Sequence, residues 1–230
     1  MKYLSLFTGI GGFELGIEQA YENKLHRESV EGTVRDGLQP RGTVSNIVCE
    51  RNGEDGRKRP HCIGYSEIDK YATSIYQKHF PNHINYGDIT TINAEELPDF
   101  DLLVGGFPCQ AFSIAGKRGG FEDTRGTLFF DLARILRAKQ PRLFVFENVK
   151  GLLSHDGGKS FATIIQTLDE LGYDCQWQVL NSKNHGVPQN RERVFIIGHL
   201  RGTSRPKYFL SEDVAKKLLV KKPGAFKQIV

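Results

Sequence analysis

The sequence predicts an α/β fold, in which helices cover both faces of a mostly parallel sheet. Short apolar runs, typical of buried parallel strands, recur along the chain. Between them, Leu128 to Ala138 and Lys159 to Leu171 show the periodicity of amphipathic helices. Polar or glycine-rich motifs follow several of the runs, where a parallel sheet collects its binding residues. The predicted strands are residues 3–7, 62–66, 84–86, 102–104, 143–146, 173–180 and 194–198.

The first predicted strand runs into a glycine-rich loop, Gly9 to Gly12, which opens a helix through about Tyr21. Glycines between a strand and a helix N-terminus let a ligand approach the backbone and its free N–H groups. The loop does not match the G-x-G-x-x-G dinucleotide pattern. A glycine loop alone does not identify a ligand, so its assignment depends on the other motifs.

Acidic residues follow the next two predicted strands. Glu67 ends the second strand, where the two oxygens of a carboxylate match the two hydroxyls of a ribose. Asp69 is placed to cap the helix that follows, through His79. Asp88, in the turn Gly87-Asp88-Ile89, is in a position where aspartate most often accepts hydrogen bonds from its local backbone.

A single cysteine, Cys109, follows the fourth predicted strand in the stretch Gly105-Gly106-Phe107-Pro108-Cys109. The two glycines let the chain leave the strand at a sharp angle, and the proline fixes the backbone just before the thiol. A nucleophile would be placed on such a turn, although most free cysteines are simply small buried apolar residues. Residues 114–121 contain three glycines and two basic side chains, which predicts a mobile loop.

Two further apolar runs carry polar motifs. Glu147-Asn148-Val149 follows residues 143–146, and Gln189-Asn190-Arg191-Glu192-Arg193 precedes residues 194–197. A surface acid is hard to reconcile with the continuously apolar run before Glu147. The two arginines of the second motif alternate with a glutamate, so an extended backbone directs both to one side.

In residue type, chain order and setting, these motifs resemble those of the DNA (cytosine-5) methyltransferases. The resemblance covers most of residues 1–200 apart from a polar stretch. It implies a Rossmann-like S-adenosylmethionine-dependent methyltransferase fold, with a mostly parallel seven-stranded sheet, an antiparallel last strand and helices on both faces. Ser5 is a departure, because many members carry an acidic residue there.

The resemblance implies S-adenosyl-L-methionine as the cofactor. The glycine loop would hold its methionine moiety and Glu67 its ribose, while Ile68 would lie against the adenine and Asp88 would receive the adenine amino group. The implied cofactor-binding residues are Phe7, Gly9, Gly11, Gly12, Glu67, Ile68, Asp88, Ile89, Pro108 and Leu128.

The implied reaction is methyl transfer to C5 of a cytosine flipped out of duplex DNA. Addition of a Cys109 thiolate at C6 would make C5 nucleophilic, and nearby arginines would lower the pKa of the thiol. Glu147 would hydrogen-bond the cytosine N3 and amine, and Arg191 and Arg193 would bind its carbonyl oxygen and a phosphate. These four are the expected catalytic residues. The expected DNA-binding residues are Gln110, Ser113, Lys117, Arg118, Asn148, Val149 and Gln189.

Length and composition exclude other classes. A chain of 230 residues with 39% hydrophobic and 25% charged residues is that of an ordinary globular protein. No apolar run approaches the roughly 20 residues that cross a bilayer, so no membrane association is expected. The four cysteines form no C-x-x-C pair, so no metal is expected. Without a cleavable leader pattern, we expect a cytoplasmic protein, associated with the nucleoid.

We expect one catalytic, cofactor-binding domain at residues 1–200, with a polar insertion at about residues 23–60, and a basic tail at residues 201–230. The tail carries a local charge of +6, which leaves −2 for the rest of a chain whose net charge is +4. A basic tail can approach phosphate or an acidic partner, and it can equally be a solvated surface.

Family members continue after the last strand with a target-recognition domain and a segment that completes the cofactor pocket. Only about thirty residues follow that strand here. We therefore expect a split enzyme of the restriction–modification kind, in which a second polypeptide brings both parts to double-stranded DNA. The alternatives are a fragment of a longer polypeptide, a tRNA cytosine-5 methyltransferase and a catalytically silent regulatory subunit.

Overall fold

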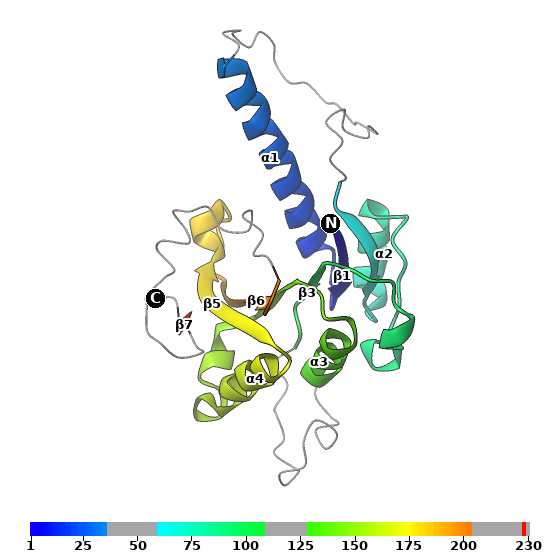
Figure 1. The fold of residues 1–230 in the computed structure, drawn as a ribbon, viewed down its shortest axis with the longest axis vertical. Coiled ribbons are helices and arrows are strands. Elements are labelled where there is room, and N and C mark those ends of the chain that lie inside the picture. The colour runs from blue at the N-terminus through cyan, green and yellow to red at the C-terminus, as the bar shows by residue number, and fades with distance from the viewer. Residues whose placement is uncertain (36–58, 109–127, 204–226, 229–230) are drawn as a thin grey trace.

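The computed structural model describes residues 1–35, 59–108, 128–203 and 227–228 (Figure 1). A seven-stranded sheet with the order β2-β1-β3-β4-β6-β5-β7 runs through the molecule. Its strands are β1 (Lys2–Leu6), β2 (His61–Ser66), β3 (Leu102–Gly105), β4 (Leu143–Val149), β5 (Tyr173–Asn181), β6 (Glu192–Leu200) and β7 (Lys227–Gln228). The α-helices are α1 (Gly12–Arg35), α2 (Lys70–His79), α3 (Leu128–Lys139) and α4 (Lys159–Glu170). Short 3₁₀ helices are η1 (Ile89–Thr91), η2 (Ala94–Glu96), η3 (Lys150–Leu153), η4 (His155–Gly158) and η5 (Ser182–His185).

The strand directions give the sheet two different ends. The pairs β1–β2, β1–β3, β3–β4 and β5–β7 are parallel, whereas β6 is antiparallel to both β4 and β5. The last residues of β1 to β4 and the first residues of β6 therefore meet at one end, which we call the carboxyl end. This arrangement confirms the predicted α/β fold with a mostly parallel sheet and a late antiparallel strand.

Helices pack on both faces of the sheet. Figure 1 shows α3 and α4 next to each other, on the side of the sheet away from α1. The core on the α3 and α4 side contains Phe144 and Phe146 of β4, whose stacked rings lie 4.3 Å apart between centroids. On the other face, Phe13 and Ile17 of α1 pack against a smaller core that includes Tyr3 of β1. Both faces of the sheet are therefore covered by packed helices.

Helix α1 begins where the sequence predicts but ends at Arg35 instead of about Tyr21. The first part of the polar insertion expected at about residues 23–60, residues 23–35, is therefore a continuation of α1. This stretch contains good helix formers such as Leu25 and Glu28 but no apolar stripe, so it lacks the periodicity that reveals an amphipathic helix. Residues 36–58 of the expected insertion lie outside the described part of the chain.

The predicted strand at residues 84–86 was also wrong, because it is reduced to one isolated bridge between Tyr65 and Asn85. Gly87, with φ 73°, turns the chain away immediately afterwards. The seventh strand is instead β7, which pairs with β5 from within the expected basic tail. The remaining predicted strands and helices agree with the structure to within a few residues, and Asp69 caps α2 as expected by accepting hydrogen bonds from Tyr71 N and Ala72 N.

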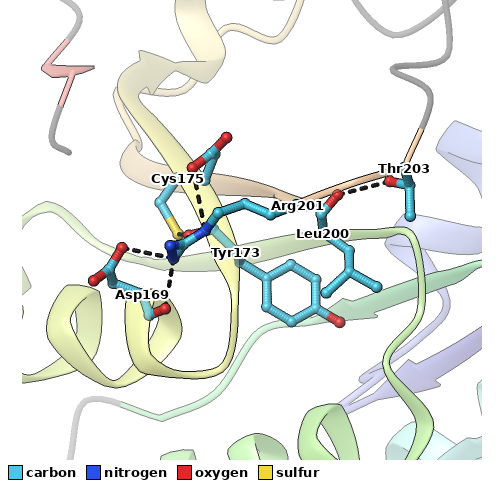
Figure 2. A network of polar contacts seen from close by, with 7 residues as sticks. Asp169, Tyr173, Cys175, Leu200, Arg201 and Thr203 are labelled. Carbon is cyan, nitrogen blue, oxygen red and sulfur yellow. Dashed lines mark hydrogen bonds and ion pairs between the residues drawn. The ribbon is translucent and has the colours of Figure 1, made fainter.

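Arg201 fastens the end of the sheet opposite the carboxyl end (Figure 2). It follows β6 directly, and its guanidinium donates to the backbone carbonyl and the carboxylate of Asp169, at 2.6 and 2.7 Å. Its Nε lies 3.5 Å from the carboxylate of Asp174, and its backbone N–H donates to Gly172 O. One side chain thus joins the end of α4 to the start of β5.

Asp101, just before β3, fastens the same end of the sheet. Its carboxylate accepts hydrogen bonds from Lys2 N at 2.9 Å and Arg142 Nη2 at 3.0 Å. Burial acts to raise the pKa of Asp101, but the Lys2 hydrogen bond and the Arg142 charge outweigh burial and hold that pKa below its ordinary value.

Among the described residues, none of the helices has the length and apolar character needed to cross a membrane.

Candidate functional site

The glycine loop turns the chain from β1 into α1 through backbone angles that few residues adopt. Gly9 and Gly11 have φ values of 57° and 96°, and Phe7 just before them has φ 55°, a strained value for a side-chain-bearing residue. A Cβ at Gly11 would come within 2.7 Å of the Phe80 ring, so this position requires glycine. A Cβ at Gly9 or Gly12 would meet nothing within 4 Å. The outer side of the loop is therefore open to a ligand.

Glu67, at the end of β2, is held against this loop. Its Oε2 accepts a hydrogen bond from Gly9 N at 2.8 Å, and its Oε1 accepts from Ile68 N and Asp69 N, each at 2.9 Å. Ile68 is 73% exposed although it is apolar. A fixed carboxylate beside an exposed apolar side chain suits a nucleoside, with the ribose at Glu67 and the base against Ile68. These residues fit the adenosine part of S-adenosyl-L-methionine.

Asn85 links this carboxylate to the next expected cofactor segment. Its Oδ1 accepts from Gly87 N at 2.9 Å, and its Nδ2 donates to Glu67 O at 3.1 Å. Asp88 is exposed and accepts from Thr90 N at 2.9 Å, so it caps η1 as a turn aspartate does. Ile89 is 2% exposed and belongs to the core, so it lies beneath this surface.

Two further expected cofactor residues flank residues 109–127, Pro108 directly before them and Leu128 directly after them. Pro108 is exposed at the carboxyl end, and Leu128 begins α3 and packs against the core. The residues Cys109, Gln110, Ser113, Lys117 and Arg118 lie outside the described residues, as does the loop predicted at 114–121.

The turn that leads to Cys109 is anchored up to Phe107. The Phe107 side chain is 3% exposed and packs against Phe129 and Phe146. Its carbonyl oxygen accepts a hydrogen bond from Asn148 Nδ2 at 2.8 Å. Asn148 is itself 2% exposed, and its Oδ1 accepts from Val149 N. Asn148 is therefore placed to hold the turn, while its expected DNA contact stays a prediction; Val149 is 39% exposed and open to a ligand.

Glu147 and Arg193 come together from neighbouring strands. Since Phe146 faces the α3 and α4 core, Glu147 points to the opposite face of β4, where Arg193 of β6 also lies. Arg193 Nε is 2.7 Å from Glu147 Oε1, with the two side chains 20% and 24% exposed. A Cβ added to Gly106 would lie 3.1 Å from Glu147 Oε2. One carboxylate oxygen thus faces Arg193 and the other faces the turn before Cys109.

The segment before β6 is organised by Asn181. Its Oδ1 accepts from Arg191 N at 3.3 Å, and its Nδ2 donates to Asn190 Oδ1 at 2.6 Å. Gln189 supports this segment through its backbone, because its carbonyl accepts from the Ser182 hydroxyl. Arg191 is exposed and precedes β6, and no contact within the described ranges joins its guanidinium to Glu147. Of the two expected arginines, the structure brings only Arg193 to the carboxylate.

Sequence analysis missed several polar residues at this end of the sheet. Asn85 joins the Glu67 segment to the Gly87 turn, and Asn181 holds the segment at residues 189–193. Lys150 forms an ion pair with Glu192 at 2.9 Å. The sequence offered one signal for these residues: each lies within or close after a predicted strand, as the functional motifs do. Among the described side chains, no group of three or more His, Cys, Asp or Glu is arranged to hold a metal ion.

Comparison with known proteins gives consistent similarities. The family model for C-5 cytosine-specific DNA methylase matches residues 50–229. The chain is 40% identical over 225 residues to the type II methyltransferase M.NgoBV of Neisseria gonorrhoeae, and 54% identical over 200 residues to the orphan methyltransferase M.Rho11sI of Bacillus phage rho11s. A solved structure of a putative DNA modification methyltransferase, encoded within an E. coli prophage, has a TM-score of 0.60 over 99% of this chain and 53% of its own, at 20% identity. The latter similarity shows the fold.

The matches cover most of this chain but a smaller share of its relatives. They span 95% of this chain and 45% of M.NgoBV, and 86% of this chain and 33% of M.Rho11sI. The chain thus spans about half the length, or less, of the curated relatives that it matches. Because the family model matches well over half of the chain, the chain belongs to the C-5 cytosine-specific DNA methylase family.

Proposed function

We propose that this chain is the catalytic portion of an enzyme that transfers a methyl group from S-adenosyl-L-methionine to C5 of cytosine in DNA. The single observation that carries the proposal is the position of Glu147, held between Arg193 and the turn that leads to Cys109. The glycine loop and Glu67 lie at the same end of the sheet. Membership of the family supports the same reaction.

S-adenosyl-L-methionine, when bound, supplies an electrophilic methyl group carried by a sulfonium. We assign the open side of the glycine loop, at Gly9, Gly11 and Gly12, to its methionine moiety. Glu67 would accept the ribose hydroxyls and Asp88 the adenine amino group, because a carboxylate accepts several hydrogen bonds and has capacity beyond the backbone N–H groups that each holds. The remaining proposed contacts are Phe7, Ile68, Pro108 and Leu128, and the buried Ile89 is proposed to support the adenine site from beneath.

Cys109 is the proposed nucleophile. Cytosine C5 is by itself a poor nucleophile, and a thiolate that adds to C6 converts the ring into an enamine whose C5 can accept a methyl group. Loss of the C5 proton then allows the thiolate to leave. The anchoring of Phe107 by Asn148 supports this role, since it fixes the backbone two residues before the sulfur.

Glu147 and Arg193 are proposed to hold the base while sulfur adds. Arg193 Nε orients one carboxylate oxygen of Glu147 and leaves the other for the N3 and amine edge of cytosine. Arg193 Nη1 donates to Glu192 O, which leaves Nη2 as a donor for the cytosine carbonyl oxygen. Arg191, exposed beside this pair, is proposed to bind a DNA phosphate.

We propose double-stranded DNA as the substrate, with the reacting base flipped out of the helix. Val149 and Gln189 are proposed to contact DNA directly and Asn148 through the turn that it holds. Gln110, Ser113, Lys117 and Arg118 are assigned to DNA from the sequence pattern alone. A DNA substrate would place the protein at the nucleoid. We also keep the division into a catalytic domain at residues 1–200 and a basic tail at residues 201–230 as a proposal.

Recognition of the target sequence is proposed to come from protein outside residues 1–230, in a second polypeptide that also completes the cofactor pocket. The greater length of the relatives supports this, because the chain matches 45% of M.NgoBV. A single longer polypeptide is the alternative, and sequencing the chromosome around the coding region distinguishes the two.

Tritium transfer from labelled S-adenosyl-L-methionine tests the proposed function. The chain, with and without the polypeptide encoded beside it, is assayed on duplex DNA and on tRNA, with Cys109→Ala as the matched control. We expect label at cytosine C5 in DNA, stimulated by the second polypeptide and absent with the variant. Label in tRNA alone would show that tRNA is the substrate instead of DNA. The absence of label from both nucleic acids would favour a catalytically silent subunit.

A further inference from the structure

A buried acid lies directly behind the glycine loop. Glu14, in the first turn of α1, is 0% exposed and follows Gly12 by two residues. Its Oε1 accepts a hydrogen bond from the Tyr76 hydroxyl of α2 at 3.1 Å. Within the part of the chain that the structure describes, its Oε2 has no hydrogen-bond partner, and neither has the nearby Ser5 Oγ of β1. An unpaired buried carboxylate is costly, so this atom needs an explanation.

The surroundings of Glu14 favour its neutral form. Burial is the largest cause that raises the pKa of Glu14, and the charge of Glu18 adds to it, while Ser5, the backbone and Tyr76 act to lower that pKa less strongly. The Ser5 hydroxyl lies beside the carboxyl, although the geometry falls short of a hydrogen bond. A proton on Oε2 would give both unpaired oxygens a partner. The described titratable groups around Glu14 include no cation: Tyr3, Glu18, Cys62, Tyr76 and, through Tyr76, His83, whose pKa is lowered by burial and by His61.

Tyr76 extends this contact across the site. Its ring stacks on Tyr65 of β2 with centroids 3.9 Å apart, and its hydroxyl lies 2.9 Å from His83 Nδ1. Phe80, one turn further along, packs against Tyr76, and its ring lies where a Cβ of residue 11 would be. Helix α2 itself begins at Lys70, two residues after Ile68. The Glu14 to Tyr76 hydrogen bond therefore joins the glycine loop to the segment assigned to the nucleoside.

We propose that Glu14 is a positioning residue for cofactor binding, which acts as a neutral carboxylic acid and ties α1 to α2 through Tyr76. The inference rests on the proposed function for the identity of the cofactor. Ionisation leaves an uncompensated charge behind the loop, so the loop loosens and binds S-adenosyl-L-methionine less tightly. Since the folded-state pKa of Glu14 is raised, its contribution to stability is complete below the ordinary glutamate pKa and is lost as pH rises through the folded-state pKa.

Amide hydrogen exchange of residues 6–15 in the full chain tests the loop without any cofactor. Rates are measured over about pH 5 to 9, around and above the ordinary glutamate pKa, and corrected for intrinsic exchange. We expect the wild-type loop to exchange faster as pH rises, and Glu14→Gln to remove that rise because the amide stays neutral and can donate to Ser5 Oγ. Tyr76→Phe keeps the ring stack but loses the hydroxyl, so it should loosen the loop at every pH. The matched controls Glu22→Gln and Tyr71→Phe, both exposed, should behave as wild type.

Calorimetric titration with S-adenosyl-L-methionine supplies the second readout. We expect Kd to rise about tenfold across the same pH range in the wild type, the factor of one lost hydrogen bond, and to stay flat in Glu14→Gln. A Glu14→Gln variant that follows the wild-type pH dependence would overturn the inference, as would a Tyr76→Phe loop that exchanges normally. If the wild type, titrated together with the polypeptide encoded beside it, binds no cofactor at any pH, the proposed function fails, whereas hydrogen exchange still decides the role of Glu14.

Discussion

The two ends of the sheet use charged side chains in opposite ways. At the carboxyl end, Glu147 pairs through one oxygen with Arg193, and its other oxygen faces the turn before Cys109 without a hydrogen-bond partner among the described residues. At the opposite end, Arg201 bonds backbone and carboxylate groups of α4 and β5 at once. Arg193 lies near the start of β6 and Arg201 directly follows its end, so belonging to this strand does not by itself explain the difference.

The two ends differ in how much hydrogen-bonding capacity their polar side chains keep for a ligand. A side chain whose bonding capacity is used by neighbouring elements contributes to stability, whereas one that keeps part of that capacity can bind a ligand. Changes at the carboxyl end should therefore act on turnover more than on folding, and changes at the opposite end should do the reverse.

The largest expected effect is on turnover in Glu147→Gln. Loss of the charge that stabilises the base should lower kcat by about 10² to 10³, while the free energy of unfolding changes by less than about 1 kcal/mol. Single-turnover methylation and urea denaturation measure the two quantities. Glu192→Gln, which breaks the exposed ion pair with Lys150, is the control and should change neither. Equal losses of folding and turnover would remove the distinction between the two ends.

Arg201→Ala should give the opposite pattern. Losing the guanidinium removes the hydrogen bonds to Asp169 and the ion pair with Asp174. The free energy of unfolding should therefore fall by about 2 kcal/mol, with kcat unchanged. Arg201→Lys keeps the charge but not the forked donors, and its loss should be intermediate. Urea denaturation with an unchanged m-value checks this. A fall in kcat without a loss of stability would assign Arg201 to the site.

Asn148→Ala should lower kcat by about tenfold, because one hydrogen bond to the turn before Cys109 is lost. Cofactor affinity should stay the same, since Asn148 has no contact with the glycine loop in the described residues. Asn93→Ala, in an exposed turn, controls for a general loss of stability. A weaker cofactor affinity with unchanged kcat would show that Asn148 does not position the nucleophile.

The smallest effect concerns Asp101 and pH. Because its folded-state pKa is depressed, its contribution to stability is present above the ordinary aspartate pKa and is lost as pH falls through the folded-state pKa. Asp101→Asn should remove part of the acid-side fall in the unfolding midpoint and leave turnover at neutral pH unchanged. Thermal unfolding between about pH 3 and 7 measures this; an unaltered acid limb in the variant would show that Asp101 carries none of it.

The elements that sequence predicts well are those with a local pattern. Helices α3 and α4 show apolar periodicity, and β3 is a continuous apolar run, so both kinds follow from a short window. The second half of α1 has no apolar stripe, and β7 has two residues and depends on β5 for its pairing. The sequence alone therefore does not show that α1 continues to Arg35, or that β7 pairs with β5.

The candidate site divides in a similar way. Motif order predicts that Glu147 and Arg193 are both functional, but their contact requires β4 and β6 to be neighbours although β5 lies between them in the chain. The exposed position of Arg191 depends on where β6 begins. Nothing local marks Glu14 as buried, because only the packing of α1 against α2 brings it to Tyr76.

The central claim is a covalent bond between Cys109 and cytosine C6. The most direct measurement is mass spectrometry of the Cys109 peptide after incubation with cofactor and duplex DNA that contains 5-fluorocytosine, in the assembly that methylates DNA. Fluorine replaces the C5 proton whose loss would release the thiolate. The account therefore predicts a stable adduct on Cys109 and none with Cys109→Ser. A wild-type protein that methylates cytosine but leaves this peptide unmodified would contradict the account.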